Sequence, residues 1–219
     1  GDLAPYLTGQ EETRRADAIA LVHRAVSDAR RGGVPHVVVL SSGLVYGCTD
    51  DATEVFVEDA PLTAHTDGLV GDLLAIEEAA LAVEAEDADT NGAAEPAGKT
   101  PLVTILRTAA LAGPGVDSMI TRHFDAPRLL TMRGLDRTWQ FAHLADVAGA
   151  VRHVAEHELA GVFNVASAGT LTAADTLAAS GMRRIDVAER FAVGIAERLH
   201  RTKVLASPPS DLDYVVRSW

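Results

Sequence analysis

The chain has 219 residues, of which 47% are hydrophobic and 23% charged, and its formal net charge is −12. This length suits one globular domain with a sizeable core. The acidic balance argues against nucleic-acid binding, which needs clustered Lys and Arg, and no apolar run approaches the roughly 20 residues of a membrane span. The first ten residues lack the pattern of a secretory signal. Cys48 is the only cysteine, which excludes an intrachain disulfide and a cysteine-built metal site. We therefore expect a cytoplasmic protein.

The first half of the chain alternates helical and strand patterns. Its predicted elements are a helix at 11–31, a strand at 37–40, a β-like piece at 54–57, a helix at 67–86 and a strand at 102–106. The run from Val37 to Leu40 is uninterrupted and apolar, which predicts a strand buried on both faces of a parallel sheet. Residues 84–100 are rich in Ala, Gly, Pro and acidic residues, so we interpret them as a mobile surface loop.

The second half continues the alternation. Its predicted elements are a short helix at 117–125, strand pieces at 128–132 and 138–143 around a turn at Gly134, a helix at 144–159, a strand at 162–165, and helices at 173–179 and 186–200. Alternating helices and buried strands predict the α/β class with a mainly parallel sheet. We expect one domain over 1–219, with core αβ units in 1–115 and a mixed part ending in helices in 116–219.

Chemistry-bearing side chains are expected where the parallel strands end. Ser41 and Ser42 follow the first strand, and open α/β sheets bind ligands at the carboxyl ends of their strands. The alternative is that both hydroxyls only cap loose backbone groups at a strand exit. Ser42, His143 and Asp146 offer the residue types of a hydrolase triad, but no G-x-S-x-G elbow accompanies them.

Two further sets of residues admit simple interpretations. His153 and His157 have the i, i+4 spacing of a metal-binding pair on a helix, but they lack a further obvious ligand, and a solvated helix face explains them as well. Arg183 and Arg184 have the pattern of surface charge. We therefore predict no metal site.

Five motifs, taken together, resemble one family. They are SSGLVYG at 41–47, EDAP at 58–61, LRTAALAGP at 106–114, FAHLADVA at 141–148 and GVFNVA at 161–166. They resemble the SS-x-x-VYG, acidic Pro-containing, LRP-x-N-x-x-GP, F-x-H-V-x-D-V-A and G-x-x-NVA segments of the extended short-chain dehydrogenases, the NAD-dependent epimerase/dehydratase family. The resemblance implies a Rossmann-like fold, NAD or NADP as cofactor, and a nucleotide-sugar or other small-molecule ligand.

The same resemblance implies roles for particular residues. Ser42 matches the catalytic Ser or Thr of the family, and Ser41 and Thr108 fall beside its cofactor. His143 falls at the substrate pocket, although a packed histidine with one bonded ring nitrogen is an alternative. Arg137 follows the turn where a basic residue of nucleotide-sugar enzymes meets phosphate.

The chain departs from this family at its proton-transfer pair. The family uses Tyr-x-x-x-Lys, because the cationic Lys lowers the pKa of the phenol that exchanges a proton with the substrate. No Tyr-x-x-x-Lys occurs in the chain. If Glu77 matches the acidic residue that follows the pair, Leu69 and Leu73 occupy the Tyr and Lys positions. Two apolar side chains cannot move a proton, so Ser42 would be a relic.

The cofactor loop is the second departure. No G-x-G-x-x-G or G-x-x-G-x-x-G occurs to cradle a pyrophosphate, and the first helix resembles the one that leads to the family's SS-x-x-VYG strand. We therefore expect a sheet that is incomplete on its N-terminal side, and it is open whether any dinucleotide binds. An open edge beside Val37 to Leu40 would favour a homo-oligomer or a partner chain.

Two functional classes stay open. One is an oxidoreductase or isomerase whose front half comes from other sequence. The other is a pseudoenzyme that keeps the fold as a binding, regulatory or assembly module. Titration with NADH and NADPH discriminates between them.

Overall fold

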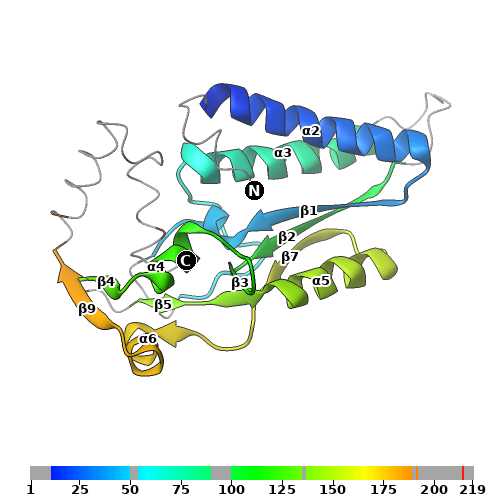
Figure 1. Ribbon diagram of the computed structural model, residues 1–219. Coiled ribbons are helices and arrows are strands. Elements are labelled where there is room, and N and C mark those ends of the chain that lie inside the picture. Colours follow the sequence, from blue (N-terminus) through cyan, green and yellow to red (C-terminus); the bar gives the residue numbers. More distant parts are fainter. Residues whose placement is uncertain are drawn as a thin grey trace.

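The core of the protein is a parallel three-stranded sheet between two layers of helices. The computed structural model describes residues 11–49, 54–89, 100–134 and 137–188, together with Phe191 and Tyr214. The strand order is β1 (His36–Ser42), β2 (Leu102–Thr108) and β7 (Gly161–Val165). Helices α2 (Glu11–Gly32) and α3 (Gly68–Asp89) lie on one face, and α5 (Leu144–Glu156) lies on the other (Figure 1). This confirms an α/β fold with a parallel sheet flanked by helices.

Strand β2 is the centre of the core. All its residues except the first are buried, and Val103 and Ile105 pack with Ala80 of α3. Partly buried valines of α2, β1 and β7 surround this cluster. Each aliphatic side chain so buried contributes about 1.5–3 kcal/mol relative to an exposed one, so β2 anchors both helical layers to the sheet.

Strand β1 corrects one expectation. It was expected to be buried on both faces, but its valines are only half-buried and Leu40 is 55% exposed. The reason is its position: among the described residues β1 pairs only with β2, so one of its edges has no neighbouring strand. An apolar run of residues correctly predicts a strand, but the burial of that strand depends on the elements that lie beside it in the fold.

Helices α2 and α3 are joined by a buried carboxylate. Asp72 of α3 is 3% exposed, and it accepts hydrogen bonds from Arg14 and Arg15 of α2. Arg15 Nη2 also donates to the carbonyl oxygen of Thr66, just before α3 begins. These contacts hold the N-terminal half of α3, which carries Leu69 and Leu73, at a fixed position against α2.

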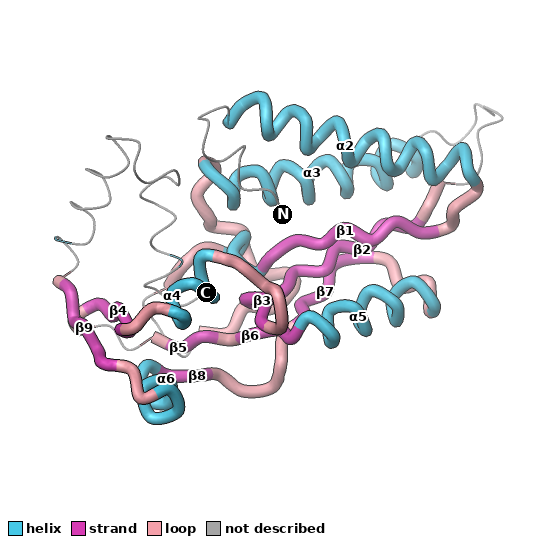
Figure 2. The backbone as a smooth tube through the Cα atoms, in the orientation of Figure 1, coloured by secondary structure: helices cyan, strands magenta, loops and turns pink. Residues whose placement is uncertain are grey.

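The remaining elements are short helices and strands, and the strands form three small two-stranded sheets (Figure 2). They are η1 (Gly43–Tyr46), β3 (Ala110–Ala112), α4 (Met119–Asp125), β4 (Arg128–Met132), β5 (Thr138–Trp139), β6 (Phe141–His143), β8 (Leu171–Thr172), α6 (Ala173–Ser180) and β9 (Arg183–Val187). Strand β3 pairs with β6 and β4 with β9, both parallel, whereas β5 and β8 are antiparallel. A second cluster of Leu129, Trp139 and Ala173 fills the space between them.

Three boundaries differ from the sequence prediction. Residues 54–57 form no strand, because the carbonyl of Phe56 is bound by a side chain, that of Asn164, rather than by a neighbouring strand. Residues 84–89 belong to α3, since Ala and Glu are strong helix formers, and 90–99 lie outside the described residues. Arg183, Arg184 and Asp186 lie in β9, where pairing with β4 overrides the helical pattern predicted from 186. The rest of that helix, except Phe191, lies outside the described residues.

No helix within the described residues is long and apolar enough to cross a membrane.

Candidate functional site

A cavity of about 370 Å³ lies where the three parallel strands end. Gly43 and Tyr46 reach it from the turn after β1, Arg107 from β2, and Asn164 from β7. The rest of its wall is mostly uncharged, and includes Thr49, Val55, Phe56, Ala109, Thr138, Gln140, Ala166 and Thr170. Hydroxyl and amide groups beside an aromatic ring are typical of a small-molecule pocket. The expectation of a site at the carboxyl ends of the strands therefore leads to this cavity.

One buried ion pair supports the floor of the cavity. The Arg107 guanidinium donates through Nη2 to Glu77 Oε2 at 2.7 Å and through Nε to both carboxylate oxygens, at 3.1 and 3.2 Å. Ser41 Oγ donates to the same carboxylate at 2.5 Å. The side chains of Arg107 and Glu77 are 5% and 3% exposed. Burial alone would lower the pKa of Arg107, but the hydrogen bonds to Glu77 and Tyr46 outweigh it and hold that pKa above its ordinary value.

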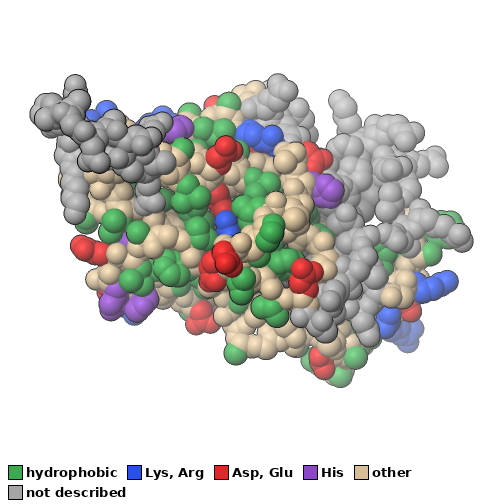
Figure 3. All heavy atoms as spheres, turned by 180° about the vertical axis from the view of Figure 1, so that it is seen from behind, with side chains coloured by type: hydrophobic (Ala, Val, Ile, Leu, Met, Phe, Trp, Pro, Cys, Tyr) green, Lys and Arg blue, Asp and Glu red, His purple; other side chains and the backbone are tan. Residues whose placement is uncertain are grey.

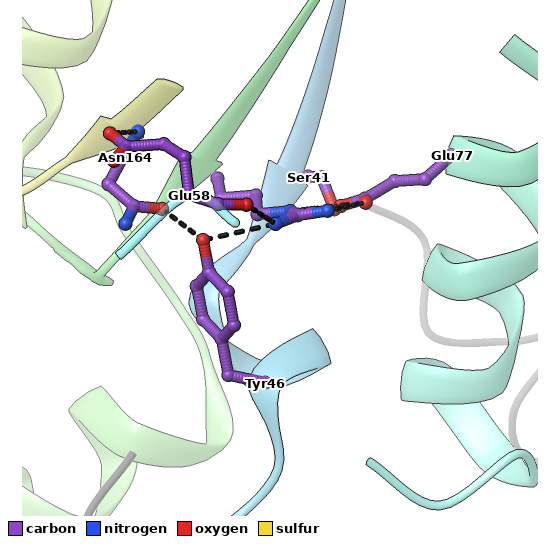
Figure 4. Close-up of polar contacts among 6 residues, drawn as sticks. Ser41, Tyr46, Glu58, Glu77 and Asn164 are labelled. Atoms are coloured by element: carbon purple, nitrogen blue, oxygen red, sulfur yellow. Dashed lines mark hydrogen bonds and ion pairs between the residues drawn. The ribbon is translucent and has the colours of Figure 1, made fainter. Parts of the chain in front are cut away.

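Tyr46 links this ion pair to the third strand (Figure 4). Its hydroxyl accepts from Arg107 Nη1 at 3.0 Å and donates to Asn164 Oδ1 at 2.8 Å. Its ring stacks on Phe56, with ring centroids 5.3 Å apart, and lies under the Arg107 guanidinium. Gly47 makes the turn possible with a φ of +94°, since a Cβ there would meet Thr63 Oγ1 at 2.5 Å.

Asn164 and Glu58 complete the network. Asn164 Nδ2 donates to the carbonyl oxygen of Phe56 at 3.2 Å, and the backbone N–H of Asn164 donates to Glu58 Oε1 at 2.9 Å. That backbone hydrogen bond is the main cause of the lowered pKa of Glu58. The third donor of the guanidinium, Arg107 Nη1, also reaches the carbonyl oxygen of Glu58 at 3.1 Å. The guanidinium of Arg107, the hydroxyl of Tyr46 and the amide of Asn164 thus all have partners within the network.

The structure brings together three of the residues singled out from the sequence. Ser41 lies in the network, and Ser42 and Thr108 are register partners on β1 and β2. Ser42 Oγ accepts from the Leu44 N–H at 3.3 Å and so caps η1, and it lies 3.4 Å from the Thr108 carbonyl oxygen. Thr108 Oγ1 donates to the Ser41 carbonyl oxygen at 3.2 Å. All three hydroxyls therefore have partners inside the fold, as the capping alternative expects.

His143 and Arg137 lie apart from these three residues. His143 is exposed, and its Nδ1 accepts from the Ala145 N–H at 3.2 Å, which caps the start of α5. Neither side chain lines the cavity, whose wall on this side is made by Thr138 and Gln140.

The surroundings of Arg137 are unusual for a charged residue. Its side chain is buried, at 3% exposure, and its Cζ lies 4.2 Å from the centre of the Trp139 ring. None of its three guanidinium nitrogens has a hydrogen-bond partner among the described residues, and neither do the buried Nε1 of Trp139 and Nε2 of His123. Burial lowers the pKa of Arg137 to about 9, although nearby Cys48 acts in the opposite direction. Burial and the positive charge of Arg137 lower the pKa of His123 to about 4.

Sequence reasoning did not identify the network itself. Tyr46, Arg107 and Asn164 were present in the recognised motifs, and Glu77 was used only to place the missing Tyr–Lys pair. The sequence did contain one signal for the network: three strands that are expected to lie side by side each end near a polar residue. The ion pair of Glu77 with Arg107 shows that Glu77 lies where α3 faces β2.

No group of three or more His, Cys, Asp or Glu side chains within the described ranges could hold a metal ion. His153 and His157 lie with ring centroids 4.2 Å apart on the exposed end of α5, and His157 Nδ1 is 2.9 Å from the His153 carbonyl oxygen.

Comparison with curated proteins finds relatives of undetermined function. No known protein-family profile matches the chain. Uncharacterized proteins of Mycobacterium tuberculosis and Mycobacterium bovis are 26% identical to it over 199 residues, which is 90% of the chain and 50% of each relative. The chain thus spans about half the length of the curated relatives it matches.

Solved structures identify the fold. A UDP-N-acetylglucosamine 4-epimerase from Bacillus cereus aligns with 92% of the chain and 72% of its own length, at 16% identity and a TM-score of 0.57. A human epimerase family protein solved with NADPH aligns with 99% of the chain and 74% of its own, at 16% identity and a TM-score of 0.60. MoeE5 in complex with UDP-glucose and NAD aligns with 79% of the chain and 58% of its own length, at 24% identity and a TM-score of 0.58. The chain is structurally similar to NAD-dependent epimerase/dehydratase proteins over most of its length.

Proposed function

We propose that this chain is a catalytically degenerate relative of the NAD(P)-dependent epimerases and dehydratases that binds a small polar ligand such as a nucleotide sugar. The observation that carries the proposal lies on α3. Glu77 of α3 pairs with Arg107 of β2. If Glu77 matches the acidic residue that follows the family's Tyr–Lys pair, Leu69 and Leu73 take the positions of the Tyr and Lys that move the proton. Leu69 is 38% exposed, and neither leucine can donate or accept a proton.

The lining of the cavity supports a sugar-like ligand. Thr138 and Thr170 line the cavity with hydroxyl groups and Gln140 with an amide, and these groups both donate and accept hydrogen bonds as sugar hydroxyls do. Phe56 adds an apolar face. Among the structural neighbours, MoeE5 was solved with UDP-glucose, and an epimerase from Methanobrevibacter ruminantium M1 with UDP-N-acetylmuramic acid.

The residues described in this chain do not fit a dinucleotide. Ser41 and Thr108, which the resemblance places beside a cofactor, already bond within the fold. The sequence contains no glycine-rich cradle for a pyrophosphate. The proposal is therefore that this chain alone holds neither NAD nor NADP with ordinary affinity, and we derive no redox step.

A second candidate function is a non-enzymatic binding, regulatory or assembly module. The observation that favours it is the outer edge of β1, which has no strand partner among the described residues and carries the exposed Leu40. On the face turned away in Figure 1, hydrophobic side chains gather with acidic ones scattered among them (Figure 3). An open strand edge with apolar side chains favours pairing with another chain.

Titration of the chain with NADH and NADPH, followed by fluorescence, tests the degenerate state. We expect no saturable binding at micromolar concentrations, and a micromolar Kd for either dinucleotide would refute the proposal.

Light scattering at high protein concentration tests the second candidate, the binding, regulatory or assembly module. We expect self-association through β1, whereas a monodisperse monomer would count against this second candidate.

A further inference from the structure

Two of the residues that line the cavity at the strand ends carry a formal charge, Glu54 and Arg107. Glu54 lies on the loop that precedes α3, next to Val55 and Phe56, which also line the cavity. Arg107 reaches the cavity from β2. The balance between these two charges decides which ligand charge the cavity favours.

The positive charge of Arg107 is already compensated within the fold. Its guanidinium donates to the Glu77 carboxylate at distances of 2.7 to 3.2 Å. Its Nη1 donates to the Tyr46 hydroxyl and to the carbonyl oxygen of Glu58 (Figure 4). An incoming phosphate or carboxylate would have to compete with these partners for a side chain that is 5% exposed, so Arg107 offers little to an anion.

The negative charge of Glu54 is not compensated. Glu54 is exposed and makes no hydrogen bond or ion pair with the described residues. Glu58, further along the same loop, adds a second carboxylate, which accepts from the backbone N–H of Asn164 in the cavity wall. That hydrogen bond lowers the pKa of Glu58 and keeps the group ionised. Together with the chain's net charge of −12, the two carboxylates give this side of the cavity a negative potential.

The neutral groups of the wall favour a ligand that donates. Gln140 Nε2 donates to the carbonyl oxygen of Ser167 at 3.0 Å, which orients the amide, and its Oε1 acceptor has no hydrogen bond with the described residues. The hydroxyls of Thr138 and Thr170 can accept as well as donate. Phe56 adds an aromatic ring, and such rings attract cations. An ammonium group, which only donates, therefore suits this wall better than an ionised phosphate or carboxylate, which only accepts.

We propose that the cavity binds a small organic cation, with an ammonium group beside Glu54 and Phe56 and hydroxyl groups beside Gln140, and that it disfavours anionic groups. This inference rests on the proposed function in one respect, that the cavity is the ligand site. The phosphates of a nucleotide sugar would then lie outside the cavity.

Three probes with the same sugar ring test the charge preference. The isotope-labelled chain is titrated with D-glucosamine, D-glucose and D-glucuronate at constant ionic strength and about pH 6, where the amine of glucosamine is protonated. NMR signals of the side-chain amides of Gln140 and Asn164 report binding in the cavity. We expect glucosamine to bind roughly threefold tighter than glucose or better, as an exposed ion pair allows, and glucuronate to bind more weakly than glucose. Glucuronate that binds at least as tightly as glucose overturns the proposal.

Variants connect the preference to Glu54. The E54Q variant keeps the shape of the side chain and removes its charge, so it should abolish the advantage of glucosamine and change the affinity for glucose less than about twofold. The control is E78Q, which removes the same charge from an exposed position on α3 and should retain the advantage. Circular dichroism confirms that both variants are folded. An advantage that survives in E54Q, or that disappears equally in both variants, overturns the proposal.

Salt dependence gives a second readout that needs no variant. Because Glu54 is exposed, added sodium chloride should weaken the binding of glucosamine and leave that of glucose unchanged. Equal salt dependence of the two sugars contradicts an ion pair in the cavity.

A parallel titration with UDP-glucose distinguishes this inference from the proposed function. If UDP-glucose binds and neither glucosamine nor glucose does, the charge preference is wrong and the proposed function stands. If none of the probes binds, both are wrong.

Discussion

Arg107 and Arg137 have nearly equal burial but opposite surroundings. Both are almost fully buried, at 5% and 3% exposure, and each guanidinium lies over an aromatic ring, that of Tyr46 or Trp139. Arg107 donates to a carboxylate, a phenol and a carbonyl, whereas Arg137 has no hydrogen-bond partner among the described residues. Accordingly, the pKa of Arg107 lies above its ordinary value and that of Arg137 falls to about 9.

The difference separates a buried arginine that is paired within the fold from one that has no hydrogen-bond partner among the described residues. A buried charge whose partners are all in place joins elements together, and here Arg107 of β2 joins α3 through Glu77 and η1 through Tyr46. A buried charge without partners destabilises the fold. The two arginines should therefore respond in opposite directions when their charge is removed.

The largest expected effect is at Arg107. The R107M variant leaves the Glu77 carboxylate buried and unpaired, and should reduce the free energy of unfolding by about 3–5 kcal/mol. Urea denaturation measures it. Replacing both partners in R107M/E77L should cost less than R107M alone. The control is R122M, which breaks an exposed pair with Asp117 and should leave the denaturation midpoint unchanged.

A smaller effect of opposite sign is expected at Arg137. In urea denaturation, R137M should be more stable than the wild type by about 1–3 kcal/mol, because methionine fills similar space without a desolvated charge. A loss of stability in R137M comparable to that in R107M would show that Arg137 is also a structural residue.

The smallest expected effect is the pH dependence due to His123. Its pKa is about 4 in the folded protein and 6.5 as an ordinary histidine, so the unfolded state takes up a proton first as the pH falls. The contribution of His123 to the free energy of unfolding is therefore constant above about pH 6.5 and falls as the pH is lowered from about 6.5 to 4. The H123Q variant should lose less stability over that window in urea denaturation. Identical pH profiles would mean that His123 is not held neutral by burial and by Arg137.

Local patterns in the sequence predicted most helices and strands, because their periodicity is a property of a few neighbouring residues. They did not predict how strands pair. The last two residues of β9 were predicted as the start of a helix, since its partner β4 lies far away in the chain and pairing overrides local preference. For the same reason the exposure of Leu40 could not be predicted, as it depends on what adjoins β1.

The candidate site was predictable in position but not in composition. The rule that ligands bind at strand ends led to Ser41 and Ser42, and the family resemblance added Thr108, which lies beside them. The rule does not reveal that Arg107 would join Glu77 and Tyr46, because these contacts span three separate elements. Arg137 was selected for its charge beside a turn, whereas its complete burial without a partner is visible only in the structure.

The register of β1 against β2 has a consequence for how the molecule assembles. Partners such as Ser42 and Thr108 are separated by 66 positions along the polypeptide, and all of α3 lies in between. A long loop must close, at a cost in chain entropy, before the central sheet gains its first contact. Refolding should therefore be limited by this search and take milliseconds to seconds rather than microseconds. Stopped-flow refolding that finishes in the dead time would show that the sheet nucleates elsewhere.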